Sequence, residues 1–190
     1  MPLYRYTQTP LRRSLFDTYR FQLSPTNQDP REKAAQNPER KVTFSDLVPG
    51  RLYNITMWTV SGGVTSRPLE RHDRLYPEPV SRINATRITD TEIFLEWQAP
   101  PGDYDGFDVA YLNARDKLIQ NSTDTNSISI GRLRPFRKYT FTIVTKSGGP
   151  QSIPRRSLPI SAVFTTKESV PGSLTNFKPF EVQPSIIKFR

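Results

Sequence analysis

Residues 42–63, VTFSDLVPGRLYNITMWTVSGG, recur without a gap as residues 128–149, ISIGRLRPFRKYTFTIVTKSGG. The offset between the two segments is 86 residues at every position. A repeat of this kind fixes the architecture of a chain before any single motif is considered, so two copies of one structural unit are predicted. The matching pairs are Leu47 and Leu133, Pro49 and Pro135, Tyr53 and Tyr139, Ile55 and Phe141, Met57 and Ile143, Ser61 and Ser147, Gly62 and Gly148, and Gly63 and Gly149.

A second internal match links residues 77–95 to residues 171–189 at an offset of 94. The repeat period is therefore about 90 residues, which is the size of a seven-stranded sandwich rather than of a solenoid unit. Each unit of this size can hold a core of its own. The matching positions are Pro77, Val80, Ile83, Ile88, Ile93 and Leu95 against Pro171, Leu174, Phe177, Val182, Ile187 and Phe189.

Apolar residues alternate with polar ones in short runs, which is the pattern of strands that bury one face. Pro100-Pro101-Gly102 and Gly148-Gly149-Pro150 end two of these runs. No stretch of ten or more residues has the 3.6-residue spacing of a helix. The sequence therefore predicts an all-β chain. The inward rows are Tyr19, Phe21 and Leu23; Ile93, Leu95 and Trp97; Phe107, Val109 and Tyr111; Ile128 and Ile130; Tyr139, Phe141 and Ile143; and Ile160, Ala162 and Phe164.

These residues resemble the fibronectin type III family. Trp97 stands where the family has its strand-B tryptophan, and Tyr111 matches its strand-C tyrosine. Leu133, Pro135 and Tyr139 match a Leu-x-Pro-x-x-x-Tyr corner, in which the tyrosine hydroxyl bonds to upstream backbone. The resemblance implies a structural core role for all five residues.

Leu47, Pro49 and Tyr53 form the same corner in the preceding repeat and are given the same structural role. Gly50 keeps the glycine that the family has after the proline, whereas Phe136 replaces it in the second corner. The second corner is therefore expected to turn less tightly.

The resemblance predicts tandem fibronectin type III (immunoglobulin-like) β-sandwiches, one complete and two truncated. Residues 1–77 are interpreted as a truncated repeat with strands C to G, residues 78–167 as a complete repeat, and residues 168–190 as strands A and B of a third. Residues 1–14 show nothing like strands A or B, so the apolar face of the first repeat is expected to lack a cover. The tryptophan of the third repeat would fall at position 191, beyond Arg190.

LVPGRLYNITMWTVSGG, TDTEIFLEW, GFDVAYL and AVFTTKESVPG look like the ectodomain of receptor-type protein tyrosine phosphatases, particularly the insect members. The resemblance implies a non-catalytic ligand-recognition and spacer segment, on the extracellular side of the plasma membrane, of a single-pass receptor. The alternative is a fragment of a cell-adhesion molecule or of a secreted matrix or glycan-binding protein. A span followed by a cysteine-bearing phosphatase domain elsewhere in the parent would favour the first.

The chain carries a net charge of +9, which raises nucleic acid, acidic glycans and anionic membranes as partners. Its 27 Lys and Arg residues are scattered, without the basic helix or paired aromatic strand motif of nucleic-acid modules, so nucleic acid is disfavoured. No run of 18 apolar residues occurs, and membrane attachment is expected only through absent parts of the parent.

No residue is predicted to be catalytic, and no cofactor or metal is expected. Phosphatase chemistry of the resembling family needs a cysteine thiolate, and the chain has no cysteine. His72, the single histidine, is interpreted as a solvated surface residue rather than a general base. Asp103 and Asp105 resemble the start of a calcium loop, but the position for its bidentate glutamate is Ala114, so a turn between strands is predicted.

Asn54, Asn84 and Asn121 each begin an Asn-x-Ser/Thr sequence, the acceptor of N-linked glycans. Asn54 lies between inward Tyr53 and Ile55 and is expected to face solvent, and Asn121 is expected in a polar loop between strands. Glycan acceptors must be exposed. We therefore predict glycans on Asn54 and Asn121, with Asn84 as a further candidate.

A protein ligand at the cell surface is the expected partner, with sulfated glycan as a second. Arg132, Arg134, Arg137 and Lys138 cluster around the second corner, which predicts either a sulfated-glycan or acidic-partner patch or a set of solvated turn charges. Trp58 points outward by alternation and is expected either to anchor a partner or to pack under a neighbouring loop.

Overall fold

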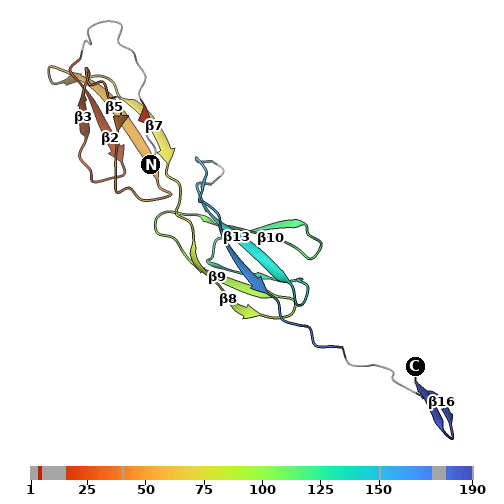
Figure 1. The fold of residues 1–190 in the computed structure, drawn as a ribbon. Helices are drawn as coiled ribbons and strands as arrows, with labels where there is room; N and C mark the ends of the chain where they lie inside the picture. The colour runs from red at the N-terminus through yellow and green to blue at the C-terminus, as the bar shows by residue number, and fades with distance from the viewer. Residues whose placement is uncertain (1–3, 6–15, 40, 150, 173–178, 190) are drawn as a thin grey trace.

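The computed structural model describes residues 4–5, 16–39, 41–149, 151–172 and 179–189. Every regular element among them is a β-strand, which confirms the all-β prediction. Figure 1 shows a first and a middle repeat arranged end to end, and a C-terminal hairpin of β16 and β17. The chain passes from β7 of the first repeat into β8 of the middle repeat.

The first repeat has one large sheet and one small one. In the large sheet β3, β2 and β5 are neighbours, and both β6 and β7 pair with β5. In the small sheet β1 pairs with β4. The strands are β1 (Tyr4–Arg5), β2 (Thr18–Ser24), β3 (Arg31–Ala34), β4 (Lys41–Val42), β5 (Leu52–Ser61), β6 (Val64–Thr65) and β7 (Leu69–Arg74).

The expectation that residues 1–14 supply no strand, and that the sheet face beside them lacks a cover, needs correction. Strand β1 lies in this segment and pairs with β4, with Tyr4 opposite Val42. A strand of two residues is too short to show alternation, so the sequence pattern misses it. The inward side chains of Phe21, Leu23 and Tyr53 are buried, with at most 6% of their surface exposed.

The middle repeat consists of two sheets that face each other. One has the order β12-β9-β8; in the other β11, β10 and β13 are neighbours, and β14 and β15 both pair with β13. The inward rows predicted from the sequence lie in β9, β10, β12, β13 and β15. The strands are β8 (Ser81–Ile88), β9 (Ile93–Gln98), β10 (Gly106–Leu112), β11 (Leu118–Thr123), β12 (Ser127–Ile130), β13 (Lys138–Ser147), β14 (Arg155–Arg156) and β15 (Ile160–Thr165).

The core of the middle repeat is apolar and closed. Trp97 is 3% exposed and meets Phe107 edge to face, with ring centroids 5.3 Å apart. Tyr111 and Phe141 are tilted against each other at 5.5 Å. Burial of one large apolar side chain contributes about 1.5–3 kcal/mol, so a core of this size holds the two sheets together. Apolar side chains with no exposed surface are Ile93, Leu95, Phe107, Val109, Phe141 and Ile143.

The C-terminal hairpin of β16 (Pro179–Gln183) and β17 (Ile186–Phe189) repeats the pairing of β8 with β9. The pairs of the two hairpins are related by the offset of 94 that the sequence shows. A register shift occurs at the same place in both. The equivalent pairs are Ile88–Ile93 and Val182–Ile187, Arg87–Phe94 and Glu181–Lys188, and Ala85–Leu95 and Pro179–Phe189.

Candidate functional site

Each repeat has a tyrosine corner just before its long strand, β5 or β13. The Tyr53 hydroxyl accepts a hydrogen bond of 2.9 Å from the backbone N–H of Val48. The Tyr139 hydroxyl accepts the same bond, 2.8 Å, from the N–H of Arg134. Of the other core residues singled out in the sequence, Leu133 is buried, whereas Leu47 and Pro49 are half-buried and Pro135 is exposed.

The two corners have the same backbone conformation, although a looser second corner was expected. Gly50 has φ +73° and Phe136 has φ +48°, both in the left-handed region. Asp46 and Arg132, four residues earlier in each corner, are also left-handed, with φ of +56° and +59°. The tyrosine bond is present in both corners and imposes the turn, so Phe136 adopts a conformation that suits glycine.

The first corner forms part of the joint between the first and middle repeats. Asp103, in the loop that connects β9 to β10, donates its backbone N–H to the Pro49 carbonyl at 2.9 Å. Its carboxylate accepts two bonds from the Arg51 guanidinium, at 2.9 and 3.1 Å. A Cβ on Gly50 would lie 1.8 Å from the Asp103 carbonyl oxygen. The close approach of the two repeats therefore requires glycine at this position.

Arg74, the last residue of β7, links the two repeats through four hydrogen bonds. Its guanidinium donates to the Gly50 carbonyl of its own repeat at 2.8 Å. The other three acceptors belong to the middle repeat: the Ser147 hydroxyl at 3.1 Å, the Ser152 hydroxyl at 2.9 Å and the Ile153 carbonyl at 3.0 Å. The fixed fork of a guanidinium suits such convergent acceptors better than a lysine would.

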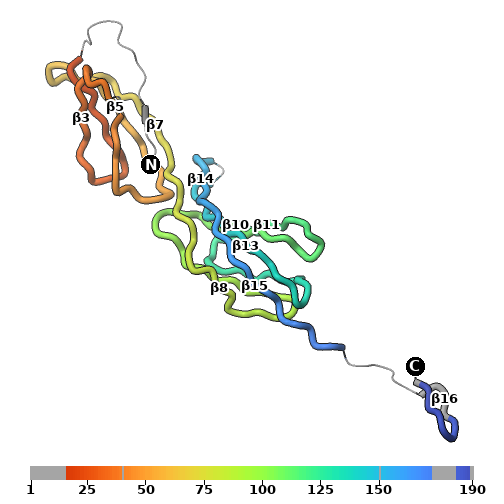
Figure 2. Tube along the Cα trace, in the orientation of Figure 1, coloured from red at the N-terminus to blue at the C-terminus, as the bar shows by residue number. Residues whose placement is uncertain are grey.

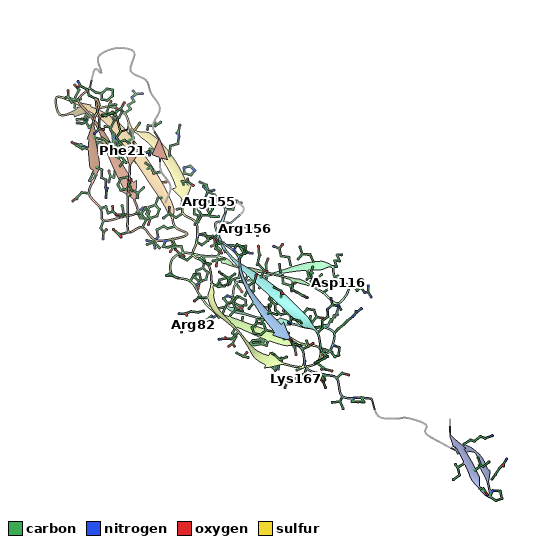
Figure 3. All side chains as sticks on the ribbon, in the orientation of Figure 1. Phe21, Arg82, Asp116, Arg155, Arg156 and Lys167 are labelled. Carbon is green, nitrogen blue, oxygen red and sulfur yellow. The ribbon has the colours of Figure 1, made fainter. Side chains whose placement is uncertain are left out.

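Arg155 makes a second link across the joint from the opposite direction. It lies in β14, donates to the Asp73 carboxylate at 2.7 Å and to the Arg74 carbonyl at 3.1 Å, and lies over the Tyr76 ring at 5.1 Å. Figure 3 shows Arg155 and Arg156 at the end of the middle repeat that faces the first repeat, with Asp116 and Lys167 at the opposite end.

An insertion in the middle repeat supplies these contacts. Strands β6 and β14 are equivalent, because both pair with the end of the preceding long strand in the same register. The hairpin turn between β5 and β6 is Gly62-Gly63, whereas residues 148–154 connect β13 to β14, which is five residues more. Figure 2 shows β14 beside the end of the first repeat. Ser152 and Ile153 belong to this longer loop.

Electrostatics favour the closed joint at neutral pH. The hydrogen bond from Arg51 holds the pKa of Asp103 below its ordinary value, with a further contribution from the charge of Arg74. Both partners of this pair keep more than a third of their side-chain surface exposed, so water screens the attraction. Geometry, rather than charge alone, is therefore what fixes the joint.

A groove of ≈830 Å³ runs beside the joint. Its walls include Leu47 and Tyr76 from the first repeat and Leu158 from the middle repeat. Tyr76 and Leu158 are 66% and 77% exposed. Arg155 pairs with Asp73 in the wall of the groove. The formal charges of the lining cancel, so no net charge selects a ligand; the charged residues are Asp46, Asp73, Glu78, Arg74, Arg155 and Arg156.

A carboxylate is buried under cations on the outer face of the middle repeat. Asp108 in β10 is 4% exposed and contacts Lys146 and Arg156, both at 2.8 Å, and the Ser122 hydroxyl at 2.6 Å. Burial raises the pKa of such an acid, but the bonds from Lys146 and Ser122 and the two positive charges outweigh it, so the pKa of Asp108 is lowered. The negative charge of Asp108 therefore offsets one of the two positive charges of Lys146 and Arg156.

The predicted basic patch around the second corner keeps three outward cations. Arg132, Arg134 and Lys138 are exposed, and no ion pair joins them among the described residues. Arg137 is half-buried, pairs with Asp116 and lies over the Tyr139 ring at 5.8 Å. Phe136, between these residues, is 71% exposed. We name Arg132, Arg134, Phe136 and Lys138 the basic corner.

The three sequon asparagines differ in exposure. Asn54 in β5 and Asn84 in β8 are exposed. Asn121 was expected in a loop, but it lies in strand β11 and is half-buried on the same side as Ile119. The strand was missed because most of its residues are polar, so alternation of hydrophobicity is not visible in the sequence.

Other singled-out residues have ordinary positions. His72 is exposed in β7, and Trp58 is half-buried in β5 opposite Arg20. Asp103 and Asp105 lie in the loop between β9 and β10, as predicted for a turn. Among the described residues, no three His, Cys, Asp or Glu side chains gather as metal ligands do, and no helix is long and apolar enough to cross a membrane.

Sequence reasoning missed the joint contacts of Arg51, Arg74 and Asp103 and the burial of Asp108. One signal pointed to the joint, because the repeat offset rises from 86 to 94 between residues 63 and 77. That rise means that eight residues are added between the long strand and the next repeat. Nothing in the sequence shows which residues of the preceding repeat the added ones contact.

Comparisons with known proteins agree with this architecture. The sequence model named "Fibronectin type III domain" matches residues 78–161. A tenascin from Gallus gallus is 28% identical over 143 residues, which are 73% of this chain and 8% of the tenascin. The receptor-type tyrosine-protein phosphatase eta of Homo sapiens is 30% identical over 131 residues, which are 66% of this chain and 10% of the phosphatase. The chain thus spans about a tenth of the length of these relatives.

One solved structure is a two-domain fibronectin type III segment from chicken tenascin. It superposes with a TM-score of 0.58 at 19% sequence identity, over 83% of this chain and 87% of the segment. At this identity the likeness shows the fold alone.

Proposed function

Because residues 78–161 are a fibronectin type III domain, we propose that the chain is a ligand-recognition and spacer segment of a receptor-type protein tyrosine phosphatase, on the extracellular side of the plasma membrane. The fibronectin type III fold is non-catalytic, so phosphatase chemistry belongs to another part of the parent. The observation that carries the proposal is the 30% identity to a receptor phosphatase over 131 residues. The segment would position loops and transmit engagement along the chain.

The alternative is an adhesion or secreted matrix protein, which the match to tenascin over 143 residues favours. Sequencing the complete transcript separates the two. We expect a membrane span followed by a domain with a cysteine in a phosphate-binding loop. Further fibronectin type III repeats with neither span nor phosphatase domain would replace our proposal with the alternative.

We propose three repeats, with residues 1–77 in the first, 78–167 in the second and 168–190 in the third. The hairpin of β16 and β17 supports the third, because its register and its register shift repeat those of β8 and β9. The equal lengths of β5 and β13, ten residues each, and of β2 and β10, seven each, support the first.

We propose that the basic corner takes part in binding a sulfated glycan or an acidic protein ligand. Three exposed cations and one exposed aromatic ring converge there, and Phe136 is held at a positive φ that costs about 1–2 kcal/mol. An outlier of this kind motivates a hypothesis of function. Sulfate groups attract cations by charge, and the ring offers an apolar surface to a sugar or side chain.

Retention on heparin tests this role of the corner. A variant with Arg132, Arg134 and Lys138 changed to alanine should elute at lower salt than the unmodified chain, because three counterion-releasing contacts are lost. The matched control changes Arg67, Arg71 and Arg82 to alanine, which removes the same charge from exposed positions elsewhere. Equal elution of the two variants would remove the corner from the proposal.

We propose that the exposed sequons carry N-linked glycans in the secretory pathway. The fraction of each asparagine that carries a glycan should rise with the exposure of its side chain. Exposed Asn54 and Asn84 should therefore be glycosylated in a larger fraction of molecules than half-buried Asn121. Glycopeptide mass spectrometry of the chain secreted from insect cells measures the occupancy. Absence of sugar from both Asn54 and Asn84 would count against an extracellular location.

A further inference from the structure

The corner of the first repeat is a docking surface for the loop between β9 and β10 of the middle repeat, and two glycines allow the close approach. At Gly50 the Asp103 carbonyl takes the space of a side chain, 1.8 Å from where a Cβ would be. On the other side, a Cβ on Gly102 would lie 2.5 Å from the Pro49 carbonyl oxygen. The two backbones therefore touch where both lack side chains.

The second corner lacks this docking surface. Phe136 occupies the position of Gly50 with the same left-handed backbone, so it carries a side chain at the position where Gly50 has none. Relief by a small shift is not available at the first joint, since the atom that a Cβ would meet is backbone.

The two arginines that the first repeat contributes to the joint, Arg51 and Arg74, have no equivalents that could bond to a following repeat at the second corner. Arg51 reaches Asp103 of the next repeat, whereas its equivalent Arg137 pairs with Asp116 and donates to the Ala114 carbonyl of its own repeat. Arg74 ends β7, and the residue that ends β15 in the same register is Thr165. A threonine side chain is too short to reach across a joint.

The connections that leave the two repeats differ in the same sense. After β7, residues 75–80 carry Pro77 and Val80, both buried; Val80 is part of the core of the middle repeat. After β15, Thr166 is 2% exposed and the Lys167 carbonyl accepts a bond from the Phe136 N–H, as the Tyr76 carbonyl does from Gly50. The difference begins beyond this point, because residues 167–172 are all exposed. The offset from Arg74 to Thr165 is 91 residues and that between the two hairpins is 94, so the second connection is three residues longer.

We infer that the first and middle repeats form one rigid unit, because Gly50 lets the loop between β9 and β10 dock on the first corner, and that the second corner, with Phe136 in the place of Gly50, cannot hold a following repeat in this way. The basic corner surrounds Phe136 and is exposed, while the equivalent corner of the first repeat contacts the middle repeat. The inference does not rest on the ligand or on the parent, so it can hold or fail independently of the proposed function.

Distances between nitroxide pairs, measured by pulsed electron spin resonance, test the inference. The chain has no cysteine, so pairs of introduced cysteines can be labelled uniquely. All label sites are exposed: His72 with Thr140 spans the first joint, and Gln36 with His72 reports on the fold of the first repeat. We expect narrow distance distributions for both pairs.

Gly50→Phe places at the first joint the residue that stands at the second. We expect the His72–Thr140 distribution to broaden well beyond that of the unmodified chain, while Gln36–His72 stays narrow. The matched control is Gly63→Phe, which puts the same ring at a positive φ, +84°, where nothing lies within 4 Å of a Cβ. That control should leave the His72–Thr140 pair narrow.

If Gly50→Phe also broadens the Gln36–His72 distribution, the substitution disturbs the first repeat itself and cannot test the joint. Arg74→Ala is then the deciding variant, because it removes three bonds to the middle repeat without adding bulk. A variant that keeps Gln36–His72 narrow and broadens His72–Thr140 supports the inference. A deciding variant whose His72–Thr140 distribution is as narrow as that of the unmodified chain overturns the inference, and so does a broad His72–Thr140 distribution in the unmodified chain.

Discussion

Single residues of the middle repeat contribute to its stability through packing, and Trp97 is a large side chain of its core. It is 3% exposed and lies against Phe107. Trp97→Ala should lower the free energy of unfolding by about 3–5 kcal/mol, since large-to-small changes in a core leave a cavity. Urea denaturation followed by circular dichroism measures it. Val163→Ala, at an outward position of β15 that is 51% exposed, is the control in the same repeat and should cost less; equal losses would contradict the assigned core.

Asp108 should make the stability of the middle repeat depend on pH. Its pKa in the folded state is lowered below the ordinary value, so the stability it contributes is present above about pH 3.9, the unfolded value, and is lost as the pH falls through the folded value. Asp108→Asn should cost about 1.5–3 kcal/mol at pH 7, the range for hydrogen bonds to charged groups. Its unfolding midpoint should vary less between pH 5 and pH 2 than that of the unmodified repeat. An unchanged pH profile would contradict the account.

At the scale of elements, the corner before β13 is under backbone strain that glycine would relieve. Phe136→Gly should raise the free energy of unfolding by about 1 kcal/mol, because Phe136 at φ +48° is 71% exposed and has little packing to lose. Phe136→Ala is the control, since it removes the ring and keeps the Cβ. Thermal unfolding of both variants measures the difference, and a gain of the same size for alanine would assign the effect to the ring.

The strands that alternation predicts are those with an apolar inward row, such as Tyr139, Phe141 and Ile143 in β13. Strand β11 escapes prediction because only Ile119 marks its inward side, and β1 and β14 escape because two residues carry no period. The corners are visible because tyrosine and proline recur at a fixed spacing. The joint contacts are not visible in the sequence, because Arg74 and Asp103 differ in no local sequence feature from other charged residues.

At the scale of the whole molecule, stability should be concentrated in the middle repeat. Among the described residues, the buried apolar side chains of the first repeat are Tyr19, Phe21, Leu23, Tyr53 and Val60, and each keeps at least 4% of its surface exposed. The middle repeat has six with none exposed. A smaller core leaves the first repeat more often open, and proteases cleave open states.

Limited proteolysis of the 190-residue chain should therefore leave a resistant fragment near residues 78–167, with residues 1–70 and 170–190 digested early. Mass spectrometry of the fragments over time gives the order of cleavage. Trp97→Ala in the same chain is the control: a loss of about 3–5 kcal/mol from a total of about 5–15 kcal/mol should make the middle repeat as labile as its neighbours.

The joint protects the first repeat against this digestion, because the bonds from Arg74 and Arg51 tie the first repeat to the middle one. If residues 1–70 survive as long as the middle repeat, and Arg74→Ala shortens their survival, the joint rather than the core of the first repeat is what preserves its fold; if they survive in that variant too, the smaller core is sufficient and the predicted order is wrong.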